Sequence, residues 1–320
     1  MNKIKRSGKL LRAAFAVLFR EKKLLLFPLI ATGLAMVAAL FFLAPIVLYP
    51  TGHSYFSAAH WSALAGKFSQ AFQPAHGVPV VITKTSAIMF FSNHWWAAPL
   101  FAVAYFVSMF LATFSNVAFY HEIMQALNGQ TISIRRGFRF AAARWRAILL
   151  WSLFAGLVGY IINAIEERVG FLGRVITGFI GTAWSVACVF IIPTLVRDTE
   201  TTSPFRLLRN SVGTLKRSWG ELVIGFVGLE LAGAILMLAL VLAMFGVGTG
   251  AFYVGVHFHL HTLWLVFVAV GGLFAVVMSL SWISSVVNPV YRCALYIYAT
   301  EGVVPGTFDK ELLDSAWKVK

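Results

Sequence analysis

The amino-acid sequence predicts an all-α, polytopic membrane helix bundle with six transmembrane helices. Of the 320 residues, 59% are hydrophobic and only 12% are charged, and the mean hydropathy is +0.81. A soluble globular domain averages roughly 45–50% apolar and about 25% charged residues. This composition excludes a disordered chain, and the presence of only two cysteines excludes a small domain held together by disulfides.

Six long apolar runs predict the spans. A helix needs about 20 apolar residues to cross a bilayer core of roughly 30 Å. Transmembrane β-strands are shorter and alternate between polar and apolar residues, so they do not fit these runs. The predicted single transmembrane domain has spans at residues 24–48, 95–118, 148–165, 175–196, 222–245 and 263–287, an outer loop at 51–94, and a tail with a short helix at 298–320.

The lysines and arginines are distributed unequally between the two sides of the predicted spans. All but four of the 26 lie in residues 1–23, 121–147 and 197–221 or from residue 288 onward. Cationic residues near the ends of spans are retained on the cytoplasmic side of a membrane. We therefore expect both termini in the cytoplasm, and we assign the net charge of +14 to contact with anionic lipid headgroups rather than with nucleic acid.

A basic amphipathic segment precedes each odd-numbered span. These segments are residues 7–15, 133–141 and 203–211, and each begins with a serine that can cap a helix. Such helices lie in the membrane interface, so Arg12, Arg139 and Arg209 are predicted to face lipid headgroups. The pattern favours three repeats of a surface helix and a helical hairpin, although any loop before a span can be basic and amphipathic by chance.

Several stretches carry a resemblance to a known family. They are AWSVACVFIIP at 183–193, SPFRLLRNSVGTLKRSWG at 203–220, ALYIYATEGVVPGTFD at 294–309, and the opening MNKIKRS with LLLFPLI at 24–30. Together they resemble a bacterial family of six-span integral membrane proteins of unknown function. That family is loosely similar to the membrane domain joined to some glycerophosphodiester phosphodiesterases. The resemblance implies a multi-pass protein of the bacterial inner membrane and implies no activity.

The sequence contains no recognisable catalytic motif, so we do not expect an enzyme or a cofactor. His121 and Glu122 begin like the HExxH helix of metalloproteases, but Gln125 stands where the second histidine is needed. Glu166 and Glu167 are adjacent carboxylates without a convincing nucleophile nearby, and they are interpreted as a solvated helix end.

Three alternating histidines form a candidate metal site. In an extended strand His257, His259 and His261 would point to one side and could share Zn²⁺ or Cu²⁺ with a histidine of the outer loop. The alternative is that these are ordinary exposed loop histidines.

Glu230 is a single acidic residue within the fifth apolar run. A charge at that depth costs on the order of 2.5–3.5 kcal/mol, so either a partner inside the bundle or a raised pKa is expected for this carboxyl group. The candidate polar site joins Glu230 to a stripe on the sixth span formed by Ser281, Ser284, Ser285 and Asn288. The stripe could supply interhelical hydrogen bonds or line a transport path.

Two functions follow as hypotheses. The first is a non-catalytic integral membrane protein that organises lipid or a partner at the cytoplasmic leaflet. The alternative is a transporter or channel whose polar path involves Glu230 and the serines of the sixth span. Anionic lipids are the expected partners, and a protein partner or a homo-oligomer stays open.

Overall fold

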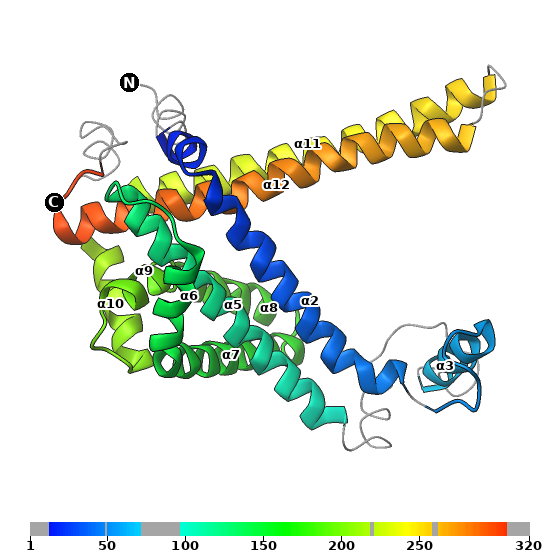
Figure 1. Cartoon of the computed structure of the whole chain (residues 1–320), viewed down its shortest axis with the longest axis horizontal. Coiled ribbons are helices and arrows are strands. Elements are labelled where there is room, and N and C mark those ends of the chain that lie inside the picture. Colours follow the sequence, from blue (N-terminus) through cyan, green and yellow to red (C-terminus); the bar gives the residue numbers. More distant parts are fainter. Residues whose placement is uncertain (1–12, 49, 72–96, 218–220, 258–261, 306–320) are drawn as a thin grey trace.

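The computed structural model describes residues 13–48, 50–71, 97–217, 221–257 and 262–305. Within these residues the chain is helical and has no strand, which confirms the all-α prediction (Figure 1). A helix at 13–20 is followed by η1 (Lys22–Leu25), α2 (Leu26–Val47), α3 (Ala58–Ala71), α5 (Ala97–Leu127), α6 (Ile134–Ala143), α7 (Trp145–Arg168), α8 (Phe171–Ala187), α9 (Ile191–Arg197), α10 (Pro204–Arg217), α11 (Glu221–His257) and α12 (Thr262–Glu301).

Six helical stretches are long and apolar enough to cross a membrane, which confirms the multi-pass class. They are Lys22–Pro45, Pro99–Leu127, Trp145–Glu166, Val175–Arg197, Leu238–His257 and Val266–Glu301. The fourth stretch is divided between α8 and α9 by a turn at 188–190. Pro193 lies in the first turn of α9, where its missing N–H loses no intrahelical bond, whereas it could not continue α8 without breaking one.

Helix α11 extends past the predicted fifth span, residues 222–245, and continues as helix to His257. Gly246, Gly248 and Gly250, interpreted from the sequence as allowing close helix approach and a tight outer turn, therefore lie within a helix, and the turn is not formed there. Gly248 faces α12, and a Cβ atom there would lie 3.2 Å from Val270. Gly248 therefore allows the two helices to approach closely, whereas a Cβ atom at Gly246 or Gly250 would meet nothing within 4 Å.

The buried side chains gather at one end of the molecule, which we call the core end. The largest fully buried apolar side chains include Phe190 at the start of α9, Leu195 in α9 and Leu295 in the last turns of α12. The buried cluster also takes residues from the end of α5, the start of α2, the helix at 13–20, η1, α6, α7 and α10. Away from this end the pair α11 and α12 runs in one direction and α2 and α5 run in another (Figure 1). Most of the large apolar side chains on these stretches are exposed. Protein packing therefore holds the core end, and the apolar surface beyond it is suited to contact with lipid.

Helix α6 folds back against the end of α5. Gly129, with φ +78°, makes the turn between them, and the Ser133 hydroxyl accepts the backbone N–H of Arg136 as the N-cap. Gly137 faces α5 so closely that a Cβ atom would lie 2.8 Å from the Ala118 carbonyl oxygen. The second predicted amphipathic helix is confirmed, because its glycine and Ala141 are buried while Arg139 is exposed.

An ion pair between a buried carboxylate and a half-buried arginine fastens α6 to α5. Glu122 is fully buried, and its Oε1 and Oε2 accept hydrogen bonds from Arg136 Nε at 2.9 Å and Nη2 at 2.7 Å. The backbone N–H of Ser133 donates to Oε2 at 2.7 Å, and His121 Nδ1 lies 3.1 Å from Oε1. The Glu122 carboxylate raises the pKa of Arg136 by hydrogen bonding. Loss of the arginine would leave a buried carboxylate without a partner, which lowers the stability of the fold.

Helix α10 confirms the third predicted amphipathic segment. It begins at Pro204, a favoured first helical residue. Leu207, Ser211 and Leu215 form its buried stripe at a spacing of four residues, and the Ser211 hydroxyl donates to the Ala187 carbonyl at the end of α8. The first predicted segment is described only from residue 13, which is helical, so Arg12 lies outside the described residues.

Replacement by alanine of one glycine in each amphipathic helix, Gly137 in α6 and Gly213 in α10, should change the free energy of unfolding in opposite directions. Gly137→Ala places a Cβ atom against backbone and should lower the free energy of unfolding by about 1–3 kcal/mol. Gly213→Ala in α10 meets nothing within 4 Å and should raise it by up to about 1 kcal/mol through helix propensity. Unfolding in SDS followed by circular dichroism measures both values. A stable Gly137→Ala protein would contradict the close approach of α6 and α5.

Removal of the buried charge should destabilise the protein far more than removal of a surface charge. Glu122→Gln should lower the free energy of unfolding by about 1.5–3 kcal/mol because the charge-assisted hydrogen bonds from Arg136 are lost, although Arg136 itself is 37% exposed. Glu301→Gln breaks an exposed pair with Arg197 and should cost no more than about 1 kcal/mol. A double-mutant cycle of Glu122 and Arg136 in the same unfolding assay gives the coupling, and additive losses would refute it.

Candidate functional site

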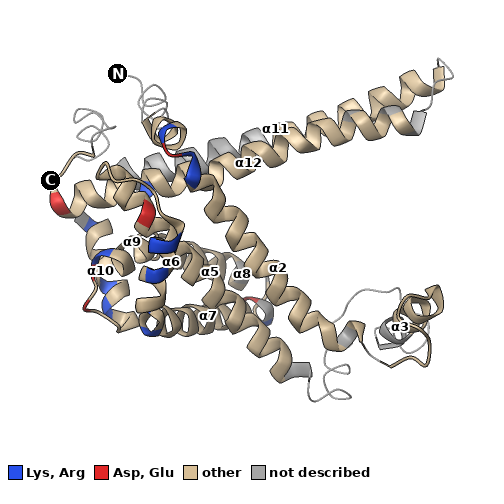
Figure 2. Cartoon of the chain, in the orientation of Figure 1, with Lys and Arg blue, Asp and Glu red and all other residues tan. Residues whose placement is uncertain are grey.

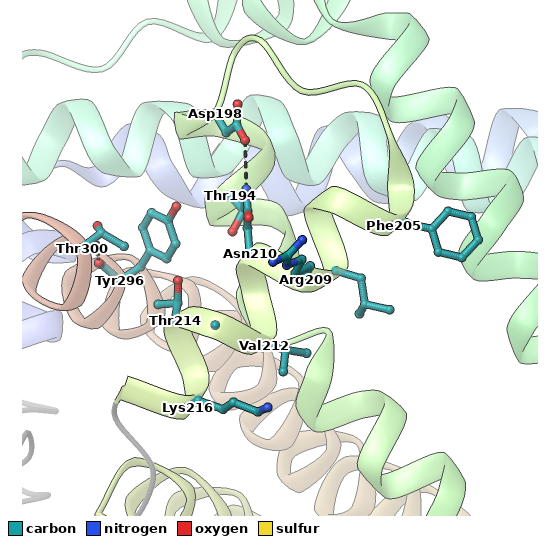
Figure 3. Close-up of a pocket in the computed structure, with 12 residues that line it drawn as sticks. Thr194, Asp198, Phe205, Arg209, Asn210, Val212, Thr214, Lys216, Tyr296 and Thr300 are labelled. Carbon is teal, nitrogen blue, oxygen red and sulfur yellow. Dashed lines mark hydrogen bonds between the residues drawn. The ribbon is translucent and has the colours of Figure 1, made fainter. Parts of the chain in front are cut away.

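A pocket of about 740 Å³ opens at the core end between α9, α10 and the last turns of α12 (Figure 3). We call it the α9–α10–α12 pocket. Its walls combine cationic, acidic, hydroxyl and apolar side chains, and its lining residues are Thr194, Asp198, Phe205, Leu208, Arg209, Asn210, Val212, Gly213, Thr214, Lys216, Tyr296 and Thr300.

Each wall is positioned by local hydrogen bonds. Asp198 follows α9, and its Oδ1 accepts the backbone N–H of Thr201 at 3.1 Å while its Oδ2 accepts Asn210 Nδ2 at 3.1 Å. The Thr194 hydroxyl donates to the Phe190 carbonyl at 2.7 Å, and the Thr300 hydroxyl donates to the Tyr296 carbonyl at 2.8 Å. The bond between Asp198 and Asn210 joins the two chain segments that face each other across the pocket.

Neighbouring charges hold this region in place. Arg197 donates from Nε to Glu301 Oε1 at 2.6 Å, which ties the end of α9 to the end of α12. The buried Arg144 donates from Nη2 to the Thr201 carbonyl at 3.0 Å. Burial lowers the pKa of the Arg144 guanidinium, and the negative charge of Asp198 opposes that shift. Arg144 therefore holds the backbone at Thr201, whose N–H donates to the Asp198 carboxylate.

One edge of the pocket is apolar and leads toward a membrane-spanning helix. Leu208 and Val212 are half-buried, and Phe205 is 69% exposed. The Phe205 ring lies 4.9 Å, centroid to centroid, from the ring of Phe154 in α7. Figure 3 shows Phe205 at the edge of the pocket, away from Thr300 and Tyr296 on the opposite side. The pocket therefore has a polar side and an apolar side, as an amphiphilic ligand requires.

The lysines and arginines gather at the core end, around α6, α9 and α10 (Figure 2). Of the predicted lipid-facing residues, Arg139 is exposed on α6 and Arg209 is exposed in the α9–α10–α12 pocket. The sequence did not indicate that Arg209 shares a cavity with Asp198, Lys216 and Thr300. Amphipathic patterning marks the exposed face of α10, but it carries no signal for the segment that lies opposite.

The candidate polar site around Glu230 is placed only by its backbone. Helix α11 ends at His257 and α12 begins at Thr262, and the rise per residue is the same in both helices. Glu230 and Asn288 are about equally far along their helices from the connecting turn, so they lie at about the same level. The side chain of Glu230 is outside the described part of the structure. Ser281, Ser284 and Ser285 are exposed one to two turns nearer that turn, and the Ser285 hydroxyl donates to the Trp282 carbonyl at 2.6 Å. The polar path stays a prediction.

The candidate metal site loses part of its geometric basis. His257 is the last residue of helix α11, so the extended strand on which the alternation argument depends does not include it. His259 and His261 lie outside the described residues. No group of three or more potential ligands is found within the described part of the chain. Metal binding by these histidines stays a prediction, but the extended strand assumed for it does not include His257.

His60, one of the outer-loop histidines considered as a metal ligand, is fully buried in a structural role. Its Nε2 donates to the Val47 carbonyl at 3.1 Å, and its Nδ1 accepts the Thr51 hydroxyl at 2.6 Å. The Val47 carbonyl is one that the end of α2 leaves without a helical donor. His60 therefore ties α3 to the end of α2.

The chain matches a family described as a family of unknown function (DUF6159) over residues 97–306. The chain belongs to this family. The DUF6159 region is about two-thirds of the chain and runs from the first residue of α5 through α12. It contains the Glu122–Arg136 pair and the α9–α10–α12 pocket, whereas α2 and α3 precede it.

No curated protein and no solved structure matches the chain. The DUF6159 match supports the predicted resemblance to a membrane protein family of unknown function. The looser likeness to the membrane domain of glycerophosphodiester phosphodiesterases stays a prediction.

Proposed function

We propose that the protein is a non-catalytic, multi-pass protein of the bacterial inner membrane that organises lipid or a partner at the cytoplasmic leaflet. The observation that carries the proposal is the gathering of lysines and arginines on α6 and α10 at the core end (Figure 2). Arg135, Arg139, Arg206, Arg209 and Lys216 in these helices are exposed. Both helices are amphipathic, and both lie where membrane-crossing helices begin.

The arrangement of α6 supports an attachment to headgroups. Its buried face carries Gly137 and Ala141 against α5, and the Glu122 pair fixes its rotation. Arg135 and Arg139 are consequently directed outward, and both are exposed. A lysine or arginine near an anionic membrane surface contributes about 1 kcal/mol to attraction. The core end would then face the cytoplasm, as the distribution of cations favours.

Orientation can be tested with single-cysteine variants in which Cys188 and Cys293 are replaced by alanine. A membrane-impermeant maleimide should label Thr202→Cys only in inverted vesicles and Ser54→Cys only in right-side-out cells. Both positions are exposed, and they lie at the core end and after α2, respectively. The opposite labelling pattern would refute the orientation.

Lipid attachment should depend on the cations of α6 and the start of α10. In nanodiscs with equal amounts of phosphatidylglycerol and phosphatidylcholine, native mass spectrometry should find phosphatidylglycerol enriched among retained lipids. Replacement of Arg135, Arg139 and Arg206 by glutamine should lower the enrichment at least fivefold, since each cation contributes about 1 kcal/mol.

Arg168→Gln provides the matched control for that experiment. Arg168 is exposed at the far end of α7, on the predicted outer side, and its replacement should leave the enrichment unchanged. Equal retention of the two lipids by the wild-type protein would refute the proposal. Retention of a stoichiometric non-lipid solute that is lost with Glu230→Gln would favour the transporter hypothesis instead.

A further inference from the structure

We propose that the α9–α10–α12 pocket binds one phospholipid headgroup that carries both a phosphodiester and an ammonium group, as the headgroup of phosphatidylethanolamine does. The inference deepens the proposed function and rests on it, because it requires the core end to lie at a membrane surface. It differs in chemistry, since the cations of α6 attract any anionic lipid, whereas this pocket presents charges of both signs.

The phosphodiester would lie along α10 between Arg209 and Lys216. Both residues are exposed and line the pocket, and seven residues place them on one face of the helix, two turns apart. Gly213 lies between them on the same face, and a Cβ atom there would meet nothing within 4 Å. The glycine therefore leaves open space between two cationic side chains that are long enough to reach a phosphate from either side.

The ammonium group would contact Asp198 on the facing wall. Each carboxylate oxygen of Asp198 accepts one hydrogen bond, from Thr201 or from Asn210. A carboxylate oxygen has two lone pairs, so both oxygens can accept a further donor. Because Asn210 is adjacent to Arg209 in the chain, the acidic group lies close to the cationic wall (Figure 3). The carboxylate also disfavours a dianionic phosphate, since like charges repel.

The apolar edge of the pocket identifies a lipid as the source of the headgroup. A water-soluble phosphate ester gains nothing from Phe205, Leu208 and Val212. The acyl chains of a lipid could pass over Phe205 toward α7, where Phe154 contacts its ring. The headgroup would then contact the polar side of the pocket, and the acyl chains would contact its apolar side and the surface of α7.

Native mass spectrometry in nanodiscs of equal phosphatidylethanolamine and phosphatidylglycerol tests the proposal. The wild-type protein should keep one phosphatidylethanolamine at detergent concentrations that remove other lipids. The double variant Arg209→Gln, Lys216→Gln should retain it at least fivefold less. Asp198→Asn keeps a hydrogen-bonding side chain but loses the charge, and it should shift retention toward phosphatidylglycerol. An unchanged thermal midpoint establishes that each variant is folded.

The α6 double variant Arg135→Gln, Arg139→Gln is the matched control and should keep its phosphatidylethanolamine. Unaltered retention in the pocket variants, or preference of the wild-type protein for phosphatidylglycerol at this site, would overturn the inference. Displacement of the lipid by water-soluble glycerophosphoethanolamine, a phosphodiester without acyl chains, at equal concentration would overturn the inference that the ligand is a lipid. Loss of lipid in the α6 variant with retention in the pocket variants would support the proposed function and refute the pocket.

Discussion

The carboxylate of Glu122 is the constraint on which the core end depends. A fully buried acidic side chain must be paired, and the Arg136 guanidinium and the Ser133 N–H supply that pairing from the first turn of α6. The requirement fixes where α6 starts, how it is rotated and which of its arginines face outward. Helix α5 also packs against α2, α7, α9 and α12. The Glu122 pair therefore joins α6 to the helix that contacts most of the buried cluster.

Protein packing stabilises the core end, and contact with the membrane stabilises the helices beyond it. At the core end, ion pairs and buried apolar side chains join segments that are far apart in the sequence, such as α9 and α12 through Arg197 and Glu301. Beyond it, each spanning helix satisfies its own backbone hydrogen bonds and exposes apolar side chains. This arrangement suits a chain whose outer helices are solvated by lipid tails, because lipid imposes no penalty on exposed leucine or phenylalanine.

Local sequence predicts the helices well and the site poorly, for an identifiable reason. Length and hydropathy predict the six spans, and the serine and proline starts predict α6 and α10 at Ser133 and Pro204. The pocket depends on Asp198 meeting Asn210 and on α9 meeting Thr300, which are tertiary contacts without a local pattern. Glu122 does have a signal in the sequence, because it is the lone acidic residue among five arginines between the second and third predicted spans.

The α11–α12 hairpin has a consequence for where the protein can reside. The two helices have 37 and 40 residues, about 55 and 60 Å in length, and α11 contains a single charged residue after its first, Glu230. A hydrocarbon layer of roughly 30 Å cannot cover such a length in an upright helix. The hairpin must therefore tilt, thicken the lipid around it or continue past the layer into the core end. Bilayer thickness would accordingly set the angle of this arm and, through α12, the strain on the core end to which it is joined.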